Sequence, residues 1–205
     1  MPNHITNKLH LVGDDEHIKK LIIAIKDDKV GLGSVDFNKI LPMPEHIFTG
    51  DLGTEERKKY SENNWYDWSV ENWGTKWNAY GFLGMTSEEK LPYASAEEHQ
   101  KAHGNILEFQ TAWSGVSELM RKLSEIFPNV EIRYGWADED IGSNVGMETY
   151  KNGEIIESDI PECQSKEAYE LAFEVFDDEP HNMWYRYDED EGTYVYDEEF
   201  CMELQ

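Results

Sequence analysis

The residue types best suited to chemistry gather in one short segment, Glu71-Asn72-Trp73-Gly74-Thr75-Lys76-Trp77-Asn78. A carboxylate, an amine and an amide beside two indole rings can recognise a ligand or transfer a proton. The binding residues predicted in this segment are Glu71, Trp73, Lys76, Trp77 and Asn78. A structural interpretation competes with this one: Gly74-Thr75 makes a turn, Lys76 pairs with Glu71, and both tryptophans lie in the core. The segment holds no nucleophile beside a base, so no catalytic residue is predicted.

A second candidate site is a run of carboxylates near the C-terminal end. The chain has 18 Lys and Arg against 43 Asp and Glu, a net charge of −25, and residues 131–205 carry 23 acidic but only 4 basic side chains. The run Asp188-Glu189-Asp190-Glu191 is predicted to be the exposed turn of a strand pair, with Asp197, Glu198 and Glu199 on the returning strand. Like charges repel and salt screens them only partly, so a protein that needs solubility alone could spread them. We therefore expect Asp188, Glu189, Asp190 and Glu191 to form a docking surface for a cationic partner.

Two patterns offer metal ligands, and each departs from the known spacing. His99 and His103 are four residues apart, with Glu98 beside them, but Gln100 stands where zinc proteases place a glutamate. The acidic stretches 138–144 and 188–199 are similar to calcium loops, yet Thr193 occupies the position that an EF-hand gives to glycine. We expect neither a metal ion nor a cofactor.

Composition and motifs exclude several classes of function. A surface this acidic repels phosphates, which argues against direct binding of nucleic acid or of an anionic membrane. No Walker loop, GxGxxG or GxSxG motif is present. The N-terminus lacks the pattern of a signal peptide, and the apolar run Leu21–Ile25 is too short to span a bilayer. Cys163 and Cys201 are typical of reduced thiols, so these features favour a cytoplasmic protein without enzymatic activity.

Apolar periodicity predicts the elements that must position these residues. Strands are expected at residues 4–12, 35–41, 105–113 and 130–137, and amphipathic helices at 14–28 and 114–127. The aromatic-rich segment 45–104 is interpreted as an insertion with a helix around 54–72. Beyond residue 137 the sequence predicts a hairpin at Asn152-Gly153, a helix that starts near Ser165, and a strand pair between 183 and 200.

The order of these elements predicts an α+β fold, the ferredoxin-like plait. Two β-α-β units separated by the insertion would form one antiparallel sheet with helices on one face. The whole chain, 1–205, is expected to form a single domain, with the insertion at 45–104 and an acidic C-terminal extension at 160–205. Trp73, Trp77 and Trp113 are expected to be mostly buried and to hold the insertion against the plait.

Five stretches, in the same order, resemble the YubB/Api-type ferredoxin-like proteins of phages and plasmids. They are Pro2-Asn3-His4, Phe37–Pro44, Glu71–Ala79, Phe109–Ser114 and Ala137–Asp140, and the string from Asn72 to Asn78 is the most distinctive. The resemblance runs from residue 2 to about residue 175, and it departs at Gly115, where a proline is expected soon after the strand. It implies a ferredoxin-like fold and an origin in a mobile element. It implies neither an iron–sulfur cluster nor an established activity, because fold does not determine function.

Three functions remain open. The leading hypothesis is a non-enzymatic binding protein whose acidic face docks on a basic host protein, in one version as a nucleic-acid mimic that blocks a host nucleic-acid-binding protein. The alternatives are a small-ligand-binding protein and an enzyme, each with a polar and aromatic pocket around residues 71–78. A deep cleft there with a strongly perturbed titratable group would favour the enzyme, whereas a pocket lined by Trp73 and Trp77 would favour ligand binding.

Overall fold

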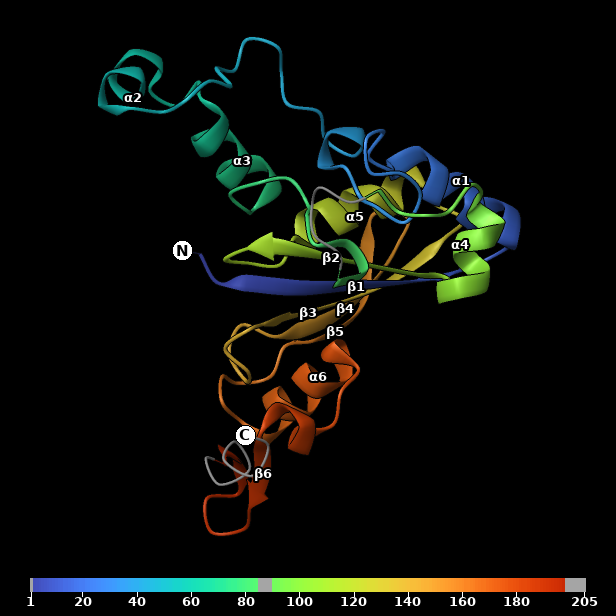
Figure 1. The fold of residues 1–205 in the computed structure, drawn as a ribbon, viewed down its shortest axis with the longest axis vertical. Helices are drawn as coiled ribbons and strands as arrows, with labels where there is room; N and C mark the ends of the chain where they lie inside the picture. The colour runs from blue at the N-terminus through green and yellow to red at the C-terminus, as the bar shows by residue number, and fades with distance from the viewer. Residues whose placement is uncertain (1, 85–89, 198–205) are drawn as a thin grey trace.

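The fold is built around one five-stranded antiparallel sheet (Figure 1). The structure, a computed structural model, describes residues 2–84 and 90–197. The sheet has the order β2-β1-β3-β4-β5, with β1 (His4–Val12), β2 (Ile106–Ala112), β3 (Glu131–Asp138), β4 (Gly146–Lys151) and β5 (Glu154–Asp159). β1 pairs with both β2 and β3, so that β2, helix α5 (Ser117–Ile126) and β3 form a split β-α-β unit around it. This arrangement agrees with the predicted ferredoxin-like α+β fold.

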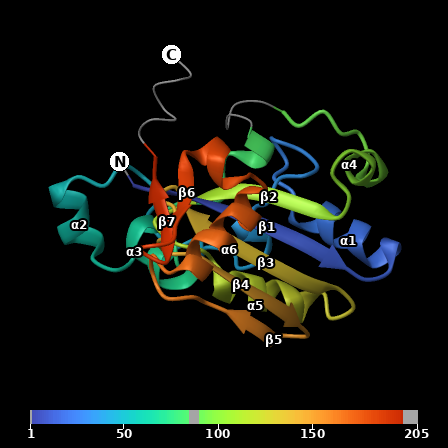
Figure 2. The same ribbon diagram turned by 90° about the horizontal axis from the view of Figure 1, so that it is seen from below.

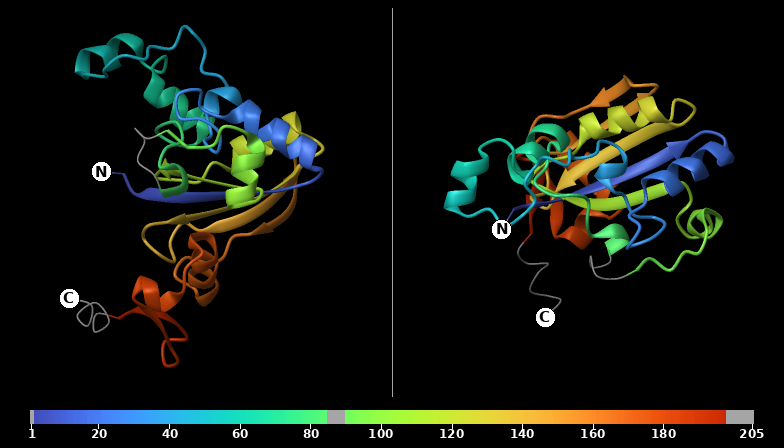
Figure 3. Two further views of the ribbon diagram at one scale, coloured as in Figure 1. Left: turned by 45° about the vertical axis from the view of Figure 1, so that its right-hand side comes forward. Right: turned by 90° about the horizontal axis from the view of Figure 1, so that it is seen from above.

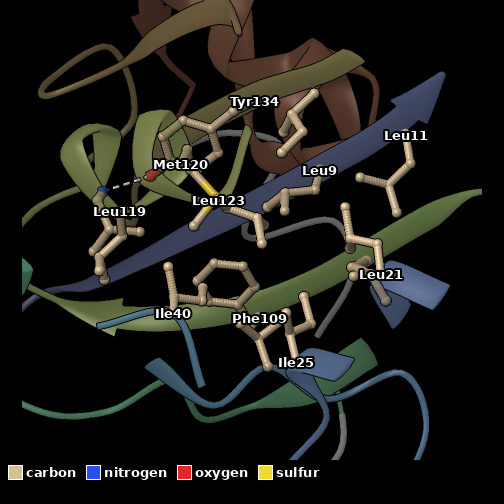
Figure 4. Close-up of a cluster of buried hydrophobic side chains, with 14 of the residues drawn as sticks. Leu9, Leu11, Leu21, Ile25, Ile40, Phe109, Leu119, Met120, Leu123 and Tyr134 are labelled. Carbon is tan, nitrogen blue, oxygen red and sulfur yellow. Dashed lines mark hydrogen bonds between the residues drawn. The ribbon is translucent and has the colours of Figure 1, made fainter. Parts of the chain in front are cut away.

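Two amphipathic helices, α1 (Asp15–Ile25) and α5, cover one face of the sheet (Figure 1). Side chains alternate along β1, and Ile5, Leu9 and Leu11 are buried on the side that these helices cover. The apolar stripes of the two helices complete the core, as Figure 4 shows; their buried apolar residues are Ile18, Leu21, Ile22, Ile25, Leu119, Met120 and Leu123. The helices predicted at 14–28 and 114–127 are present, as are the strands predicted at 4–12, 105–113 and 130–137, with small differences at their ends.

The strand predicted at 35–41 is wrong. Phe37–Lys39 forms a short 3-10 helix, η1, which begins where the Asp36 carboxylate accepts a hydrogen bond of 3.0 Å from the Asn38 N–H. The Phe37 N–H donates to Oδ1 of Asn78 at 2.8 Å. The backbone N–H groups of Phe37 and Asn38, which a strand would pair with a neighbouring strand, therefore donate to side chains instead. The free edge of β2 is met instead by Tyr80, whose backbone exchanges two hydrogen bonds with Gln110.

The C-terminal part covers the opposite face of the sheet (Figure 2). Helix α6 (Lys166–Phe176) packs on this face and forms a second core with Ala137, Ile141 and Val145. η3 (Pro180–Met183), β6 (Tyr185–Asp188) and β7 (Thr193–Tyr196) follow, and rings of this hairpin contact α6, with Tyr194 and Phe173 at 5.2 Å between centres. The added hairpin, helix and strand pair are thus present up to residue 197. Glu198, Glu199 and Cys201 lie outside the described residues.

The first part of the insertion extends away from the sheet on the side of α1 and α5, whereas its later part lies beside β2 (Figure 3). It contains α2 (Thr54–Tyr60), α3 (Trp65–Trp73), η2 (Phe82–Gly84) and α4 (Ala96–His103). The single helix expected around 54–72 is therefore two helices. α2 ends at Ser61, which has a left-handed φ of 46°, and α3 starts where the Asn64 side chain accepts hydrogen bonds from two backbone N–H groups at 3.1 Å each.

Candidate functional site

Two of the predicted binding residues, Trp73 and Asn78, tie the insertion to the η1 loop. Trp73 is only 4% exposed, and its indole Nε1 donates a hydrogen bond of 2.9 Å to the Leu41 carbonyl. Asn78 uses both ends of its amide: Oδ1 accepts from Phe37 N at 2.8 Å, and Nδ2 donates to Asp36 Oδ1 at 2.7 Å. Trp73 therefore lies in the core, as the structural interpretation predicts, and the polar groups of both residues bond within the protein.

The turn predicted at Gly74-Thr75 is present and fastens the same segment to the end of β2. Gly74 ends α3 with a left-handed φ of 76°, a conformation that glycine adopts without strain. The Thr75 hydroxyl donates to the Ala112 carbonyl at 2.8 Å and accepts from the Ala112 N–H at 3.1 Å. The Ser114 hydroxyl donates to the Gly74 carbonyl. The distinctive segment is therefore a structural clasp between the insertion and the sheet.

The expectation that Trp77 and Trp113 are mostly buried is wrong, because their exposed fractions are 37% and 42%. Both indole rings instead contact the same cation, the ammonium group of Lys76. Lys76 Nζ lies 4.3 Å from the centre of the Trp77 ring and 5.3 Å from that of Trp113. Tyr66 lies beside them, edge-on to Trp113 with 6.2 Å between the ring centres. An ammonium over aromatic faces is attracted by their quadrupoles, which stabilises half-exposed rings without full burial.

Glu71 does not join this cluster. Its side chain is exposed, and among the described residues no ion pair within 4.0 Å joins it to Lys76. The two largest cavities described below, of about 580 and 460 Å³, have no lining residue from 71–78. Within this segment Glu71 and Trp77 are exposed and Lys76 is half-buried.

The backbone of Trp113 explains how the five similar stretches come together. Its φ of 74° is left-handed, which is unusual for so large a residue. Trp113 N donates to the Asn3 carbonyl at 3.0 Å, and Asn144 Nδ2 donates to the Trp113 carbonyl at 2.9 Å. Both asparagines also donate to Asp138, at 3.0 and 3.4 Å. Together with the clasp described above, these bonds bring all five stretches to one end of the sheet.

The predicted acidic turn is present, but its four carboxylates have different surroundings. Asp188 Oδ1 accepts hydrogen bonds from the backbone of Asp190 (3.0 Å) and Glu191 (3.2 Å), and Oδ2 pairs with Arg186 at 3.0 Å. The backbone bond from Glu191 and then the Arg186 bond lower the pKa of Asp188. Asp188 thus holds the turn, whereas Glu189, Asp190 and Glu191 are exposed and available to a partner.

A groove at the C-terminal end of α6 gathers carboxylates that the sequence analysis did not single out. It has a volume of about 580 Å³, and its lining residues are Glu170, Phe173, Glu174, Asp177, Asp178, Glu179, Pro180, Asn182 and Tyr194. The Asn182 amide and then the Glu179 N–H donate to Asp178 and lower its pKa. The sequence signal was available: Glu170 and Glu174 lie four residues apart on one helix face, directly before a run of three acids.

Another cavity, of about 460 Å³, lies between the sheet and α6. Lys8, His10 and Arg133 line it together with Glu157, Asp159 and Glu174. The charges of this cavity largely cancel, in contrast to the acidic groove. The lining residues of this cavity include neither a cysteine nor a serine.

The acidic stretch at 138–144 forms a turn in which the Asp140 N–H donates to Asp138 at 3.0 Å. Among the described residues, no three His, Cys, Asp or Glu side chains are grouped so that they could hold a metal ion. Within the same residues, no helix has both the length and the apolar character needed to cross a membrane.

Comparison with known families assigns the fold independently. The model of the family described as "Ferredoxin-like domain in Api92-like protein" matches residues 92–197. The chain belongs to the Api92-like family. The resemblance found in the sequence and the predicted ferredoxin-like fold class are thereby confirmed. The matched residues contain every helix and strand from α4 to β7. Strand β1, which lies between β2 and β3 in the sheet, precedes the matched residues in the sequence. Searches of curated proteins and of solved structures found no match.

Proposed function

We propose that the chain is a non-enzymatic binding module whose acidic C-terminal part docks on a basic segment of a partner protein. The observation that carries the proposal is the α6 groove, where five carboxylates surround Phe173 and Tyr194. Carboxylates attract lysine and arginine, and aromatic faces accept a guanidinium or an apolar side chain. A segment that alternates basic and apolar residues has the chemistry to fill such a groove.

The charge around the groove supports this proposal. Residues 160–197 contain twelve acidic side chains and two basic ones, Lys166 and Arg186. Both cations already face carboxylates, Lys166 at 3.5 Å from Glu170 and Arg186 at 3.0 Å from Asp188. Most of the negative charge is therefore uncompensated locally, and such a field raises the rate at which a cationic partner arrives.

The exposed turn residues Glu189, Asp190 and Glu191 are a second part of the same acidic region. They lie in the turn between β6 and β7. The Thr193 hydroxyl at the end of this turn donates to the Gln164 carbonyl at 3.1 Å, before the start of α6, whereas the groove lies toward the end of α6, near η3. The docking role predicted for Asp188–Glu191 stays a prediction, and the α6 groove is the alternative docking site for the basic partner. Three matched sets of substitutions distinguish docking at the turn from docking at the groove.

The test measures how fast a basic peptide associates with the chain. The probe carries four basic residues around one phenylalanine, and its association is followed by stopped-flow fluorescence at low and high salt. The groove variant is Glu170→Gln/Glu174→Gln/Glu179→Gln, and the turn variant is Glu189→Gln/Asp190→Asn/Glu191→Gln. The control variant Glu55→Gln/Glu56→Gln/Glu62→Gln removes the same charge from the exposed region around α2.

The proposal expects the groove variant to associate several-fold more slowly than the control variant at low salt, with the difference shrinking at high salt. A slower turn variant with a normal groove variant would move the contact to residues 189–191. Equal rates in all three variants would reject an acidic docking site. If the natural partner binds nucleic acid through its basic segment, nucleic acid will compete with this chain, as the mimic version of the proposal requires.

A further inference from the structure

His99, on α4, is the most unusual buried polar group among the described residues. Its side chain is 0% exposed, and neither Nδ1 nor Nε2 has a hydrogen-bond partner. Buried polar atoms almost always have partners, so an imidazole with two unpaired nitrogens needs an explanation, such as an ion or a water molecule. The other buried polar side chains of the main core do not share this feature: Asn7 and Thr111, for instance, bond to each other at 2.9 Å.

Two further side chains with nitrogen or oxygen ligand atoms, Tyr93 and His103, lie beside His99. The ring centres of Tyr93, His99 and His103 form a nearly equilateral triangle, with sides of 5.3, 5.4 and 5.4 Å. The Tyr93 hydroxyl is hydrogen-bonded to His103 Nε2, so phenol and imidazole already meet. A tetrahedral zinc ion holds imidazole nitrogens at about 2.0–2.1 Å, which places two ring centres roughly 5 Å apart. The spacing of His99 and His103 matches that requirement.

The supporting structure keeps these rings in place. Ser95 caps α4 by accepting from Glu98 N at 3.3 Å, and the Glu98 carboxylate accepts from Ala94 N at 2.9 Å. Glu98, the third ligand considered from sequence, is thus turned toward the helix cap, and Tyr93 takes its place as third donor. Lys19 of α1 pairs with Glu97 of α4 at 2.9 Å, which links the two helices.

We propose that Tyr93, His99 and His103 bind one divalent transition-metal ion of the zinc class, with water in the fourth position. Two imidazoles and a phenolate suit zinc, copper or nickel better than calcium or magnesium, which prefer sites built from oxygen alone. Binding would release the phenol proton to solvent and replace the Tyr93–His103 hydrogen bond with two bonds to the ion. The site revises the expectation that the chain holds no metal, and it is independent of the proposed docking function.

The experiment uses the full chain after removal of metals with a chelator. Zn²⁺ is titrated by calorimetry in the presence of excess Ca²⁺, which occupies carboxylate sites on this acidic surface without competing for nitrogen ligands. The variants are His103→Gln and Tyr93→Phe, and the matched control is His46→Gln, which removes an exposed histidine of the insertion. Nitrogen NMR shifts of the imidazoles report directly which histidines bind.

The proposal expects one Zn²⁺ per chain in the wild type and in His46→Gln, and at least tenfold weaker binding in His103→Gln. Tyr93→Phe should also bind more weakly, and the imidazole nitrogen shifts of His99 and His103 should change on zinc addition while that of His46 stays constant. No saturable binding under excess Ca²⁺ would overturn the site. Equal affinity in His103→Gln and wild type would do the same, since it would reveal an adventitious ion only.

Discussion

The hydroxyl of Tyr134 donates a hydrogen bond of 2.6 Å to Oδ1 of Asn7 inside the main core. The same hydroxyl accepts from Val116 N at 2.7 Å, the bond drawn as a dashed line in Figure 4. One fully buried side chain therefore links β1, β3 and the start of α5, the three parts of the split β-α-β unit. Burial raises the pKa of Tyr134 well above its ordinary value, so the hydroxyl keeps its proton and remains a donor.

Removal of this hydroxyl should destabilise the chain. Tyr134→Phe leaves the Asn7 amide oxygen and the Val116 N–H buried without a partner, which costs about 1–3 kcal/mol in the free energy of unfolding. Urea unfolding followed by circular dichroism measures the change. Tyr187→Phe is the matched control, because Tyr187 is 43% exposed. Equal unfolding midpoints for both variants would contradict the linking role of Tyr134.

The two tryptophans of the clasp should behave differently. Trp73→Ala removes a buried indole and its bond to Leu41, and we expect a loss of about 3–5 kcal/mol. Trp77→Ala removes a ring that is 37% exposed and held by Lys76, so we expect a loss of about 1 kcal/mol or less. Denaturant unfolding of both variants tests the contrast. If Trp77→Ala loses as much stability as Trp73→Ala, the contrast is wrong and the Trp77 ring is buried, as the sequence predicts.

These tryptophans show where sequence patterns fail. Alternation predicts β1 correctly because Ile5, Leu9 and Leu11 face one core and the backbone of this segment pairs with strands on both sides. The segment 35–41 alternates too, but its outcome depends on Asn78, which lies 41 residues beyond Phe37 and takes its N–H. Trp77 and Trp113 are hydrophobic by composition, yet a lysine stabilises them at the surface. Long-range side-chain contacts of this kind leave no periodic signal.

Asp28 should give a measurable pH dependence. Hydrogen bonds from Lys26 at 2.6 Å and from Lys39 at 2.9 Å lower the pKa of its carboxyl to about 2. A lowered pKa means that the unfolded chain binds the proton more tightly, so the stabilisation is present above the ordinary value of 3.8 and is lost as the pH falls to about 2. Carbon NMR titration should find a higher Asp28 pKa in Lys39→Met. The neighbouring control Lys29→Met should leave the pKa unchanged, and no change in either variant would refute the bridge.

The matched Api92-like segment should not fold by itself. Residues 92–197 contain β2 and β3 but lack β1, which pairs with both strands and supplies Ile5, Leu9 and Leu11 to the core. We expect a fragment of residues 92–197 to lack the dispersed NMR spectrum of a folded protein, in keeping with the single domain inferred from the sequence. As a control, replacement of α2, which buries no residue, by a short glycine–serine linker should leave the chain folded. A well-folded 92–197 fragment would show two domains instead of one.

The acidic groove itself could be found partly from sequence. The excess of acids beyond residue 131 predicted a charged C-terminal region, and this region does cover one face of the sheet. The sequence predicts the docking surface at the turn 188–191 because its four acids are consecutive. It could not place Tyr194 beside Phe173, since that contact depends on how β7 folds back onto α6. The aromatic lining of the groove is therefore visible only in the structure.

The central claim is that this groove receives a basic protein segment, and an NMR titration of the ¹⁵N-labelled chain with the basic–phenylalanine peptide tests it most directly. We predict that the amide signals that shift most come from Glu170–Asp177 of α6, from η3 and from Tyr194, and that the shifts weaken in the groove variant but persist in the control variant. Shifts confined to another surface, or of equal size in the groove and control variants, would contradict the account.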